Sequence, residues 1–201
     1  MITPDLTTII MAGGKSSRMG TDKSFVPLLG KPMIEHVLDA VIGLADQQIL
    51  ITNKPADYAY LNLPMYGDIY PDNGPLGGFH SALYHAATPY ILVVACDMPW
   101  LNWPLLEYMI SIRETADIIV PRWEKYPEPL HAIYSQRCLE PITANLESGL
   151  LKLTTFFGRV TVNYLDRETI ARYDPSGQSF RNVNTPEELE KAKVERLQTD
   201  D

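Results

Sequence analysis

Residues 8–23, TIIMAGGKSSRMGTDK, join an apolar run to a glycine turn and then to three cations. The run Thr8–Met11 is typical of a buried strand, and Ala12–Gly14 ends it. Glycines let a backbone approach an anion closely while its N–H groups remain free to donate. Cationic side chains can then neutralise phosphate charge. The cations that follow the turn are Lys15, Arg18 and Lys23. The stretch therefore predicts a strand that delivers a binding loop for a phosphorylated ligand.

Two familiar phosphate loops do not fit this stretch. A P-loop needs a glycine five residues before Gly14, where Ile9 stands inside the apolar run. A dinucleotide-binding turn needs G-x-G-x-x-G, whereas Gly13 and Gly14 are adjacent. The pattern A-G-G-x-x-x-R-M-G-x-D-K, from Ala12 to Lys23, is similar to the signature loop of the nucleoside-triphosphate transferase superfamily. The alternative is a glycine-rich turn with solvated charges.

Composition narrows the class of protein. The chain has 201 residues, 45% of them apolar, which suits one globular domain, and we expect residues 1–201 to form a single nucleotidyltransferase domain. Its net charge of −8 argues against a nucleic-acid partner. Cys96 and Cys138 provide neither a disulfide framework nor metal-ligand spacing. With no cationic start of a signal peptide and no apolar run of membrane-spanning length, we expect a cytoplasmic enzyme without a membrane partner.

Apolar runs alternate with helical patterns along the chain. Apolar residues at i, i+4 spacing predict helices from Met33 to Ile42 and from Leu76 to Ala87, and a capping box at Thr185 starts a terminal helix to about Leu197. Strands are predicted at Thr7–Met11, Gln48–Thr52, Tyr90–Ala95, Asp117–Val120, His131–Tyr134 and Val160–Tyr164. This alternation predicts an α/β fold with a helix-covered, mainly parallel sheet.

The run Ile91–Ala95 has no polar alternation and is expected to be a central parallel strand, buried on both faces. It delivers Asp97 at its end, and Pro99 stiffens the turn that follows. In such sheets ligands bind beyond the carboxyl ends of the strands, so the loops after Met11, Thr52 and Ala95 are expected to converge. Mg²⁺ takes one or two carboxylates together with phosphate oxygens, a role that suits Asp97. The alternative is an Asp that caps a turn.

Three further segments carry candidate site residues. Gly74, Pro75 and Leu76 open a helix whose first N–H groups can hold a base or an anion, and Gly77 and Gly78 would remove side chains that block approach. The other candidates are Asp68 and Asp72 beside that turn, Asn182 and Asn184 before the terminal helix, and His131 at a turn into a strand. Each has a structural alternative, as a loop carboxylate, an Asx turn or a core histidine.

With these elements placed, the chain resembles the molybdenum cofactor guanylyltransferases, the MobA-type proteins, nearly end to end. The matching segments are MAGGKSSRMGTDK, GKPMIEHV, GPLGG, CDMP, EPLHAIY and FRNVNTPEEL. The resemblance implies an α/β, Rossmann-like fold, with a mainly parallel sheet covered by helices on both faces and a small β-lobe. It also implies transfer of GMP from GTP to the terminal phosphate of molybdopterin, with release of pyrophosphate.

The resemblance and the patterns described above together assign roles to individual residues. The resemblance itself carries over Met11, Ala12, Gly13, Gly14, Lys23, Asp68 and Asp97, and the other positions come from the patterns. Arg18, Lys23 and Asp97 would be catalytic, and Asp97 and Asn184 would bind Mg²⁺, with Mn²⁺ as a possible substitute. The acceptor would contact Asn182 and His131. Nucleotide contacts would come from Met11, Ala12, Gly13, Gly14, Lys23, Asn53, Asp68, Gly74, Pro75, Leu76 and Asp97.

Two positions depart from the family pattern. Glu128 stands where the family often has His. Ile51 aligns with a family Asn that contacts guanosine, and Asn53, two residues on, is the candidate substitute.

The implied partners are GTP and molybdopterin, together with transient contacts to other molybdenum cofactor biosynthesis proteins and target molybdoenzymes. One alternative is a molybdopterin cytidylyltransferase, whose first motif usually reads A-A-G. Another is a different small nucleotidyltransferase. A third, of another class, is a non-catalytic nucleotide-binding regulator, which would tolerate loss of the metal carboxylate.

Overall fold

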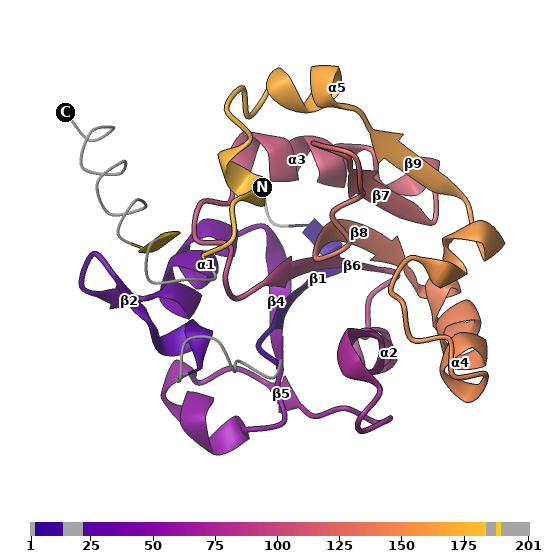
Figure 1. Ribbon diagram of the computed structural model, residues 1–201, viewed down its shortest axis with the longest axis horizontal. Helices are drawn as coiled ribbons and strands as arrows, with labels where there is room; N and C mark the ends of the chain where they lie inside the picture. The colour runs from indigo at the N-terminus through magenta and orange to yellow at the C-terminus, as the bar shows by residue number, and fades with distance from the viewer. Residues whose placement is uncertain (1–2, 14–21, 184–187, 190–201) are drawn as a thin grey trace.

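The computed structural model describes residues 3–13, 22–183 and 188–189. Its centre is a seven-stranded sheet with the order β5-β4-β1-β6-β8-β7-β9 (Figure 1). Four neighbouring strands, from β5 to β6, run parallel, β8 is antiparallel to both of its neighbours, and β7 and β9 are parallel. The strands are β1 Thr3–Met11, β4 Ala45–Ile51, β5 Met65–Tyr66, β6 Tyr90–Ala95, β7 Ile118–Pro121, β8 His131–Ser135 and β9 Val162–Leu165.

Helices cover both faces of this sheet, as predicted (Figure 1). One core joins α1, α3 and α5 to Leu6 and Ile10 of β1, and the other joins α2 and α4 to Ile9 and Met11. Successive strand residues thus enter opposite cores, as the two-residue period of a strand requires. The helices are α1 Met33–Val41, α2 Gly74–His85, α3 Trp103–Ser111, α4 Leu139–Glu147 and α5 Arg167–Ala171.

Strand β6 lies at the centre of the sheet and is deeply buried. Residues Ile91–Val94 have no exposed surface, which confirms the prediction drawn from their apolar run. The prediction of a central parallel strand needs correction, because β6 pairs in parallel with β1 but antiparallel with β8. Residues 122–130 connect β7 to β8 without a helical crossover, and parallel neighbours need such a crossover. The apolar run determined burial, and the connection determined strand direction.

A small antiparallel sheet extends from the main one and corresponds to the expected β-lobe. It pairs β2 Pro27–Leu28 with β3 Lys31–Pro32 through a turn at Leu29 and Gly30, both with positive φ. Its apolar face packs in a small core with Val183 and Leu189. The lobe therefore joins the region after the glycine turn to the end of the described chain.

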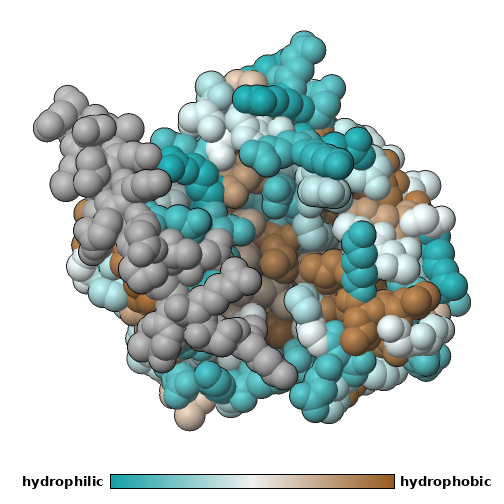
Figure 2. All heavy atoms as spheres, viewed as in Figure 1, coloured by the Kyte–Doolittle hydropathy of each residue, from teal (hydrophilic) through white to brown (hydrophobic). Residues whose placement is uncertain are grey.

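The remaining connections contain short 3₁₀ helices. These are η1 Lys23–Phe25, η2 Pro55–Leu61, η3 Arg113–Thr115, η4 Gln136–Cys138, η5 Thr155–Arg159 and η6 Gln178–Phe180. Figure 2 shows hydrophilic residues over α5 and hydrophobic ones reaching the surface around α4, where Leu150 and Leu151 are exposed. In the described part of the chain no helix has the length and apolarity to cross a membrane. The predicted helix from Thr185 falls outside the described residues, apart from 188–189.

Candidate functional site

The carboxyl ends of four parallel strands meet at one edge of the sheet. Met11 lies opposite both Ile51 of β4 and Ala95 of β6, and Ile51 lies opposite Tyr66 of β5. The amide of Ala12 donates to the Ile51 carbonyl at 2.9 Å, which continues the ladder one residue beyond the strand. The loops that carry residues 12–13, 52–53, 67–68 and 96–97 therefore leave the sheet side by side. This confirms the prediction for the loops after Met11, Thr52 and Ala95, and the structure adds the loop after β5.

Lys23 and Asp97 form the charged centre of this edge. Lys23 Nζ lies 3.8 Å from Asp97 Oδ2, and each side chain is about 20% exposed. Lys23 is the first residue of η1, which Asp22 caps by accepting from the Ser24 amide at 3.2 Å. Burial raises the pKa of the Asp97 carboxyl, and the adjacent Lys23 opposes that rise. A partly desolvated carboxylate beside one cation is suited to an additional cationic partner.

This carboxylate also meets the requirements of a magnesium ligand. Mg²⁺ usually binds through one or two carboxylates and completes its shell with phosphate oxygens and water. Within the described residues no group of three or more His, Cys, Asp or Glu side chains could hold a metal. Among those residues Asp97 offers one carboxylate to such an ion, which is enough where the oxygens of a ligand complete its shell. Asn184, the second predicted ligand, lies outside the described residues.

Asn53 and Asp68 form a reciprocal pair on the other side of the glycine turn. Asn53 Nδ2 donates to Asp68 Oδ2 at 2.9 Å, and the Asp68 amide donates to Asn53 Oδ1 at 2.8 Å. The sequence named both residues as nucleotide contacts from separate segments, and the fold places them in direct contact. Each fixes the rotamer of the other, so together they present a preorganised polar group at the rim of the site.

The start of α2 lies against this pair, and its first residues differ in their exposure to solvent. Gly74 and Pro75 are exposed, whereas the Leu76 side chain is completely buried in the core. Asn73, which precedes the helix, does not cap it with its side chain, which donates to the Pro71 carbonyl at 2.8 Å. The first turn of the helix thus stays available to a ligand through its backbone.

The expectation that Gly77 and Gly78 make room for a ligand is wrong. A Cβ on Gly77 would lie 2.6 Å from the Tyr70 carbonyl oxygen, and one on Gly78 would lie 2.6 Å from Met11 Cε. The protein itself fills the space that these glycines leave. Their absent side chains allow α2 to pack closely against the loop before it and against the end of β1.

The two predicted acceptor contacts lie in different surroundings. Asn182 is exposed and precedes Val183, whose amide donates to the Asp97 carbonyl at 3.2 Å, so it lies beside the charged centre. His131 is completely buried against Phe180, with ring centroids 5.0 Å apart. Burial lowers the pKa of His131 to about 4, so the ring is neutral at pH 7. This placement gives His131 the surroundings of a core residue.

The structure also contains site neighbours that sequence reasoning missed. Ser24 and Tyr58, which are buried, and Cys96, which is half-buried, form a hydrogen-bonded chain directly behind Lys23 and Asp97. Burial raises the pKa of the Cys96 thiol to about 12, so it remains protonated at neutral pH. Ser24 and Cys96 are next to predicted residues in the sequence. Tyr58 carries no local pattern that could have identified it.

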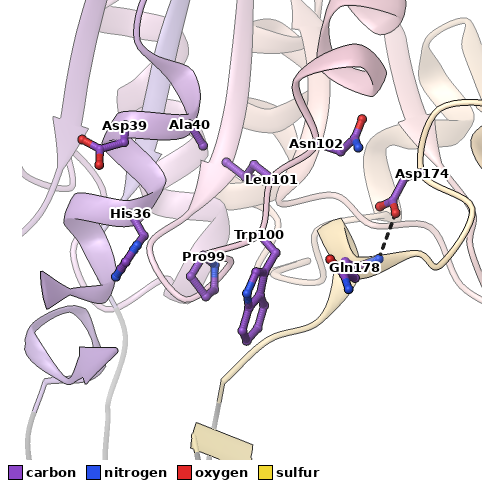
Figure 3. A pocket seen from close by; sticks show the side chains of 9 residues that line it. All are labelled: His36, Asp39, Ala40, Pro99, Trp100, Leu101, Asn102, Asp174 and Gln178. Atoms are coloured by element: carbon purple, nitrogen blue, oxygen red, sulfur yellow. Dashed lines mark hydrogen bonds between the residues drawn. The ribbon is translucent and has the colours of Figure 1, made fainter. Parts of the chain in front are cut away.

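A cavity of about 350 Å³ opens beside the loop that follows Asp97 (Figure 3). Its walls come from α1, from residues 99–102 and from the turn that contains Asp174 and Gln178. The carboxylate of Asp174 is occupied by that turn, because it accepts from the amides of Gln178 at 3.2 Å and Ser179 at 2.9 Å. The lining comes from three distant segments, so no motif in the sequence indicated it.

Comparison with known proteins gives consistent matches. The family model described as "MobA-like NTP transferase domain" matches residues 8–162. The chain is 36% identical over 191 residues to a molybdenum cofactor guanylyltransferase from Desulfosudis oleivorans, covering 94% of this chain and 95% of that protein. It is 34% identical to a protein of the same name from Vibrio vulnificus, covering 94% and 96%.

A solved structure, that of molybdopterin-guanine dinucleotide biosynthesis protein A from Archaeoglobus fulgidus, is similar over almost its whole length. It superimposes with a TM-score of 0.84 at 28% identity and covers 96% of this chain and 99% of that one. The similarity therefore includes the sheet, both helical layers and the edge that carries the charged centre.

Proposed function

Because the chain belongs to the molybdenum cofactor guanylyltransferases within the MobA-like NTP transferase family, we propose that it transfers GMP from GTP to molybdopterin. The terminal phosphate of molybdopterin is the acceptor, and pyrophosphate is the leaving group. The observation that carries the proposal is the pairing of Lys23 with Asp97 at the carboxyl edge of the sheet, 3.8 Å apart. It puts one cation and one carboxylate where the loops of four strands converge.

The reaction joins two anions, and this decides what the protein must supply. An acceptor phosphate oxygen forms a bond to the α-phosphorus of GTP, and the bond from that phosphorus to the bridging oxygen of pyrophosphate breaks. The nucleophile is already ionised at neutral pH, so no general base is needed. Catalysis then depends on alignment and on neutralising charge at the α-phosphoryl group and pyrophosphate.

Lys23 is suited to the neutralising role, since its ammonium group already lies beside a carboxylate that is partly removed from water. Arg18, from the same loop, is proposed as the second cation, although it lies outside the described residues. Mg²⁺, or Mn²⁺ in its place, would be held by Asp97 and Asn184 and would supply further positive charge to the phosphates when bound.

Nucleotide recognition is proposed to lie at the opposite rim of the same edge. The Asn53–Asp68 pair offers an amide and a carboxylate in a fixed arrangement. The backbone from Met11 to Gly13 and the exposed start of α2 at Gly74 and Pro75 would line the space between this pair and the phosphates. Asn182, on the other side of Asp97, is the remaining acceptor contact in the proposal.

The proposal is tested by measuring pyrophosphate release from purified protein with molybdopterin and each of the four nucleoside triphosphates. We expect release with GTP and Mg²⁺, formation of the guanine dinucleotide product, and much less release with CTP. Comparable release with CTP would move the assignment to cytidylyl transfer. Nucleotide binding without any pyrophosphate release would favour the regulator. Nucleotide binding itself is measured by the rise in melting temperature on adding GTP or CTP. The method is sensitive enough, because a ligand at about 100 times its Kd stabilises the folded protein by about 2.7 kcal/mol.

A further inference from the structure

A hydrogen-bonded chain of two buried hydroxyl groups and the half-buried Cys96 connects separate segments behind the charged centre. The Tyr58 hydroxyl donates to Ser24 Oγ at 2.9 Å, and Ser24 Oγ donates to Cys96 Sγ at 3.1 Å. Tyr58 belongs to η2, Ser24 to η1, and Cys96 to the loop after β6. Tyr58 and Ser24 have no exposed surface, so solvent does not compete for these hydrogen bonds.

Two members of this chain, Ser24 and Cys96, each lie one residue from the pair proposed to act on the phosphates. Ser24 directly follows Lys23, and Cys96 directly precedes Asp97. The bond from Ser24 to Cys96 therefore ties together two loops that belong to different parts of the sequence. Stacking between Phe25 and Tyr58, with ring centroids 4.8 Å apart, adds a second tie between η1 and η2.

Tyr58 anchors the arrangement to the rigid part of the molecule. Its ring lies in the same buried core as Ile34 of α1 and Leu50 of β4. By contrast η1, which carries Lys23, has only three residues and is too short to fix its own position. The Tyr58 hydroxyl thus links the segment that carries Lys23 to the main core, beside the stacking of Phe25 on the Tyr58 ring.

We propose that Tyr58 and Ser24 are positioning residues that hold Lys23 and Asp97 in the geometry needed for nucleotidyl transfer. The proposal rests on the proposed function for its kinetic consequence. The chain Tyr58–Ser24–Cys96 consists of two hydroxyls and a thiol, so it links the two loops without placing another charge beside Asp97. Misplacing a reacting or charge-neutralising group by about 1 Å can reduce a rate by up to about a hundredfold, which makes such a link consequential.

The kinetic experiment compares Tyr58→Phe and Ser24→Ala with two matched controls on β8. Tyr134→Phe removes another buried tyrosine hydroxyl, which donates to the Pro129 carbonyl at 2.7 Å. Ser135→Ala removes another buried serine, which donates to Asp117 Oδ1 at 3.2 Å at the opposite edge of the sheet. At 25 °C, well below each melting temperature, we expect kcat to fall about tenfold in the two site variants and to stay unchanged in the controls. The KM for GTP should change less than kcat.

Two further substitutions separate a positioning role from a general loss of stability. Cys96→Ser keeps an acceptor for Ser24 and should retain most of the wild-type kcat, whereas Cys96→Ala should match Ser24→Ala. The double variant Ser24→Ala/Cys96→Ala should lose no more than Ser24→Ala alone, because Ser24→Ala already breaks the link to Cys96. Independent, multiplying losses would overturn the proposal, as would wild-type kcat in Ser24→Ala and Tyr58→Phe.

Backbone hydrogen exchange provides a readout that does not depend on activity. Ser24→Ala and Tyr58→Phe should accelerate exchange in both residues 22–26 and residues 96–98, while the two controls leave these segments unchanged. Unchanged exchange in both segments would overturn the positioning role whatever the enzyme's activity. If the wild-type protein released no pyrophosphate but the variants loosened both loops, the proposed function would fail while the structural link stood.

Discussion

Polar residues lie along the whole edge of the sheet at which the parallel strands end, but the two halves of this edge differ in whether those residues are exposed. From β5 to β6 the edge presents polar side chains that remain partly or fully exposed, namely Asn53, Asp68 and Asp97. Beyond β6 the edge is closed over: His131, at the start of β8, lies beneath Phe180, which in turn stacks on Trp123. A polar residue at a strand end is thus a site residue only where no other segment covers it.

The cover over the second half is built with little tolerance. Gly177 has a φ of +65°, and a Cβ there would lie 2.1 Å from the Trp123 ring. The carboxylate of Asp174 holds the same turn together through backbone amides. The closed half therefore contributes rigidity next to the open half, where the chemistry is proposed to take place.

The largest expected effect tests the open half. Asp97→Asn keeps the shape of the side chain and removes its charge, so we expect turnover to fall by about two to three orders of magnitude. The fold should persist, because the Val183 amide bonds to the backbone carbonyl of residue 97. Asp117→Asn, at the opposite edge, is the matched control and should lower the melting temperature while leaving kcat unchanged. Steady-state kinetics and thermal unfolding of both variants test this prediction. Near-normal turnover in Asp97→Asn would show that Asp97 only shapes the turn after β6.

The next prediction concerns the half of the edge that is covered, and it uses the pH dependence of folding stability. The pKa of His131 lies at about 4 in the folded protein, because burial disfavours its charged form, against an ordinary 6.5 when unfolded. Between these values the unfolded chain binds a proton that the folded one does not. Stability is therefore fully present above pH 6.5 and is lost as the pH falls toward 4, by about 3 kcal/mol.

Urea unfolding at several pH values measures this loss. His131→Leu keeps the volume and removes the titration, so its stability should depend less on pH across that window than that of the wild type. Parallel pH profiles for the two proteins would mean that His131 is reached by water and belongs to the open half.

A smaller effect tests the packing behind the nucleotide rim. Gly77→Ala places a Cβ against the Tyr70 carbonyl, a backbone atom that cannot move aside alone, and should destabilise the protein by about 1–3 kcal/mol. Gly158→Ala meets no atom within 4 Å and should be nearly neutral. Chemical denaturation of the two variants distinguishes them. Equal stability would restore the view that Gly77 leaves space for a ligand.

The smallest effect sharpens the role of the Asn53–Asp68 pair. Asn53→Ala removes one side of an exposed hydrogen-bonded pair and should weaken GTP binding by about fivefold, roughly 1 kcal/mol. Asn163→Ala, which removes an amide bonded to Thr115 Oγ1 at 3.2 Å far from this edge, should leave the affinity unchanged. Calorimetric titration with GTP measures the affinity of both variants. If Asn53→Ala bound GTP as tightly as the wild type, Asn53 would not contact the nucleotide and would only orient Asp68.

Sequence reasoning succeeded where the relevant physics is local. Apolar runs placed the strands near their observed bounds, because burial of a strand depends on its own residues. The position of Asp97 after the most apolar strand predicted a carboxylate at the sheet edge. The predicted roles of all the site residues remain predictions. For Gly14, Arg18 and Asn184 the position is also untested, because these residues lie outside the described part of the chain.

The sequence by itself therefore determined the class of fold, the family and the loops that carry the site, since each depends on a short pattern of glycines, cations and apolar residues. Only the tertiary structure decided that β8 runs antiparallel, that His131 is covered, and that Gly77 serves packing. It alone revealed the contacts of Lys23 with Asp97 and of Tyr58 with Ser24. These contacts join segments far apart in the chain, and no local pattern encodes which buried surfaces will meet.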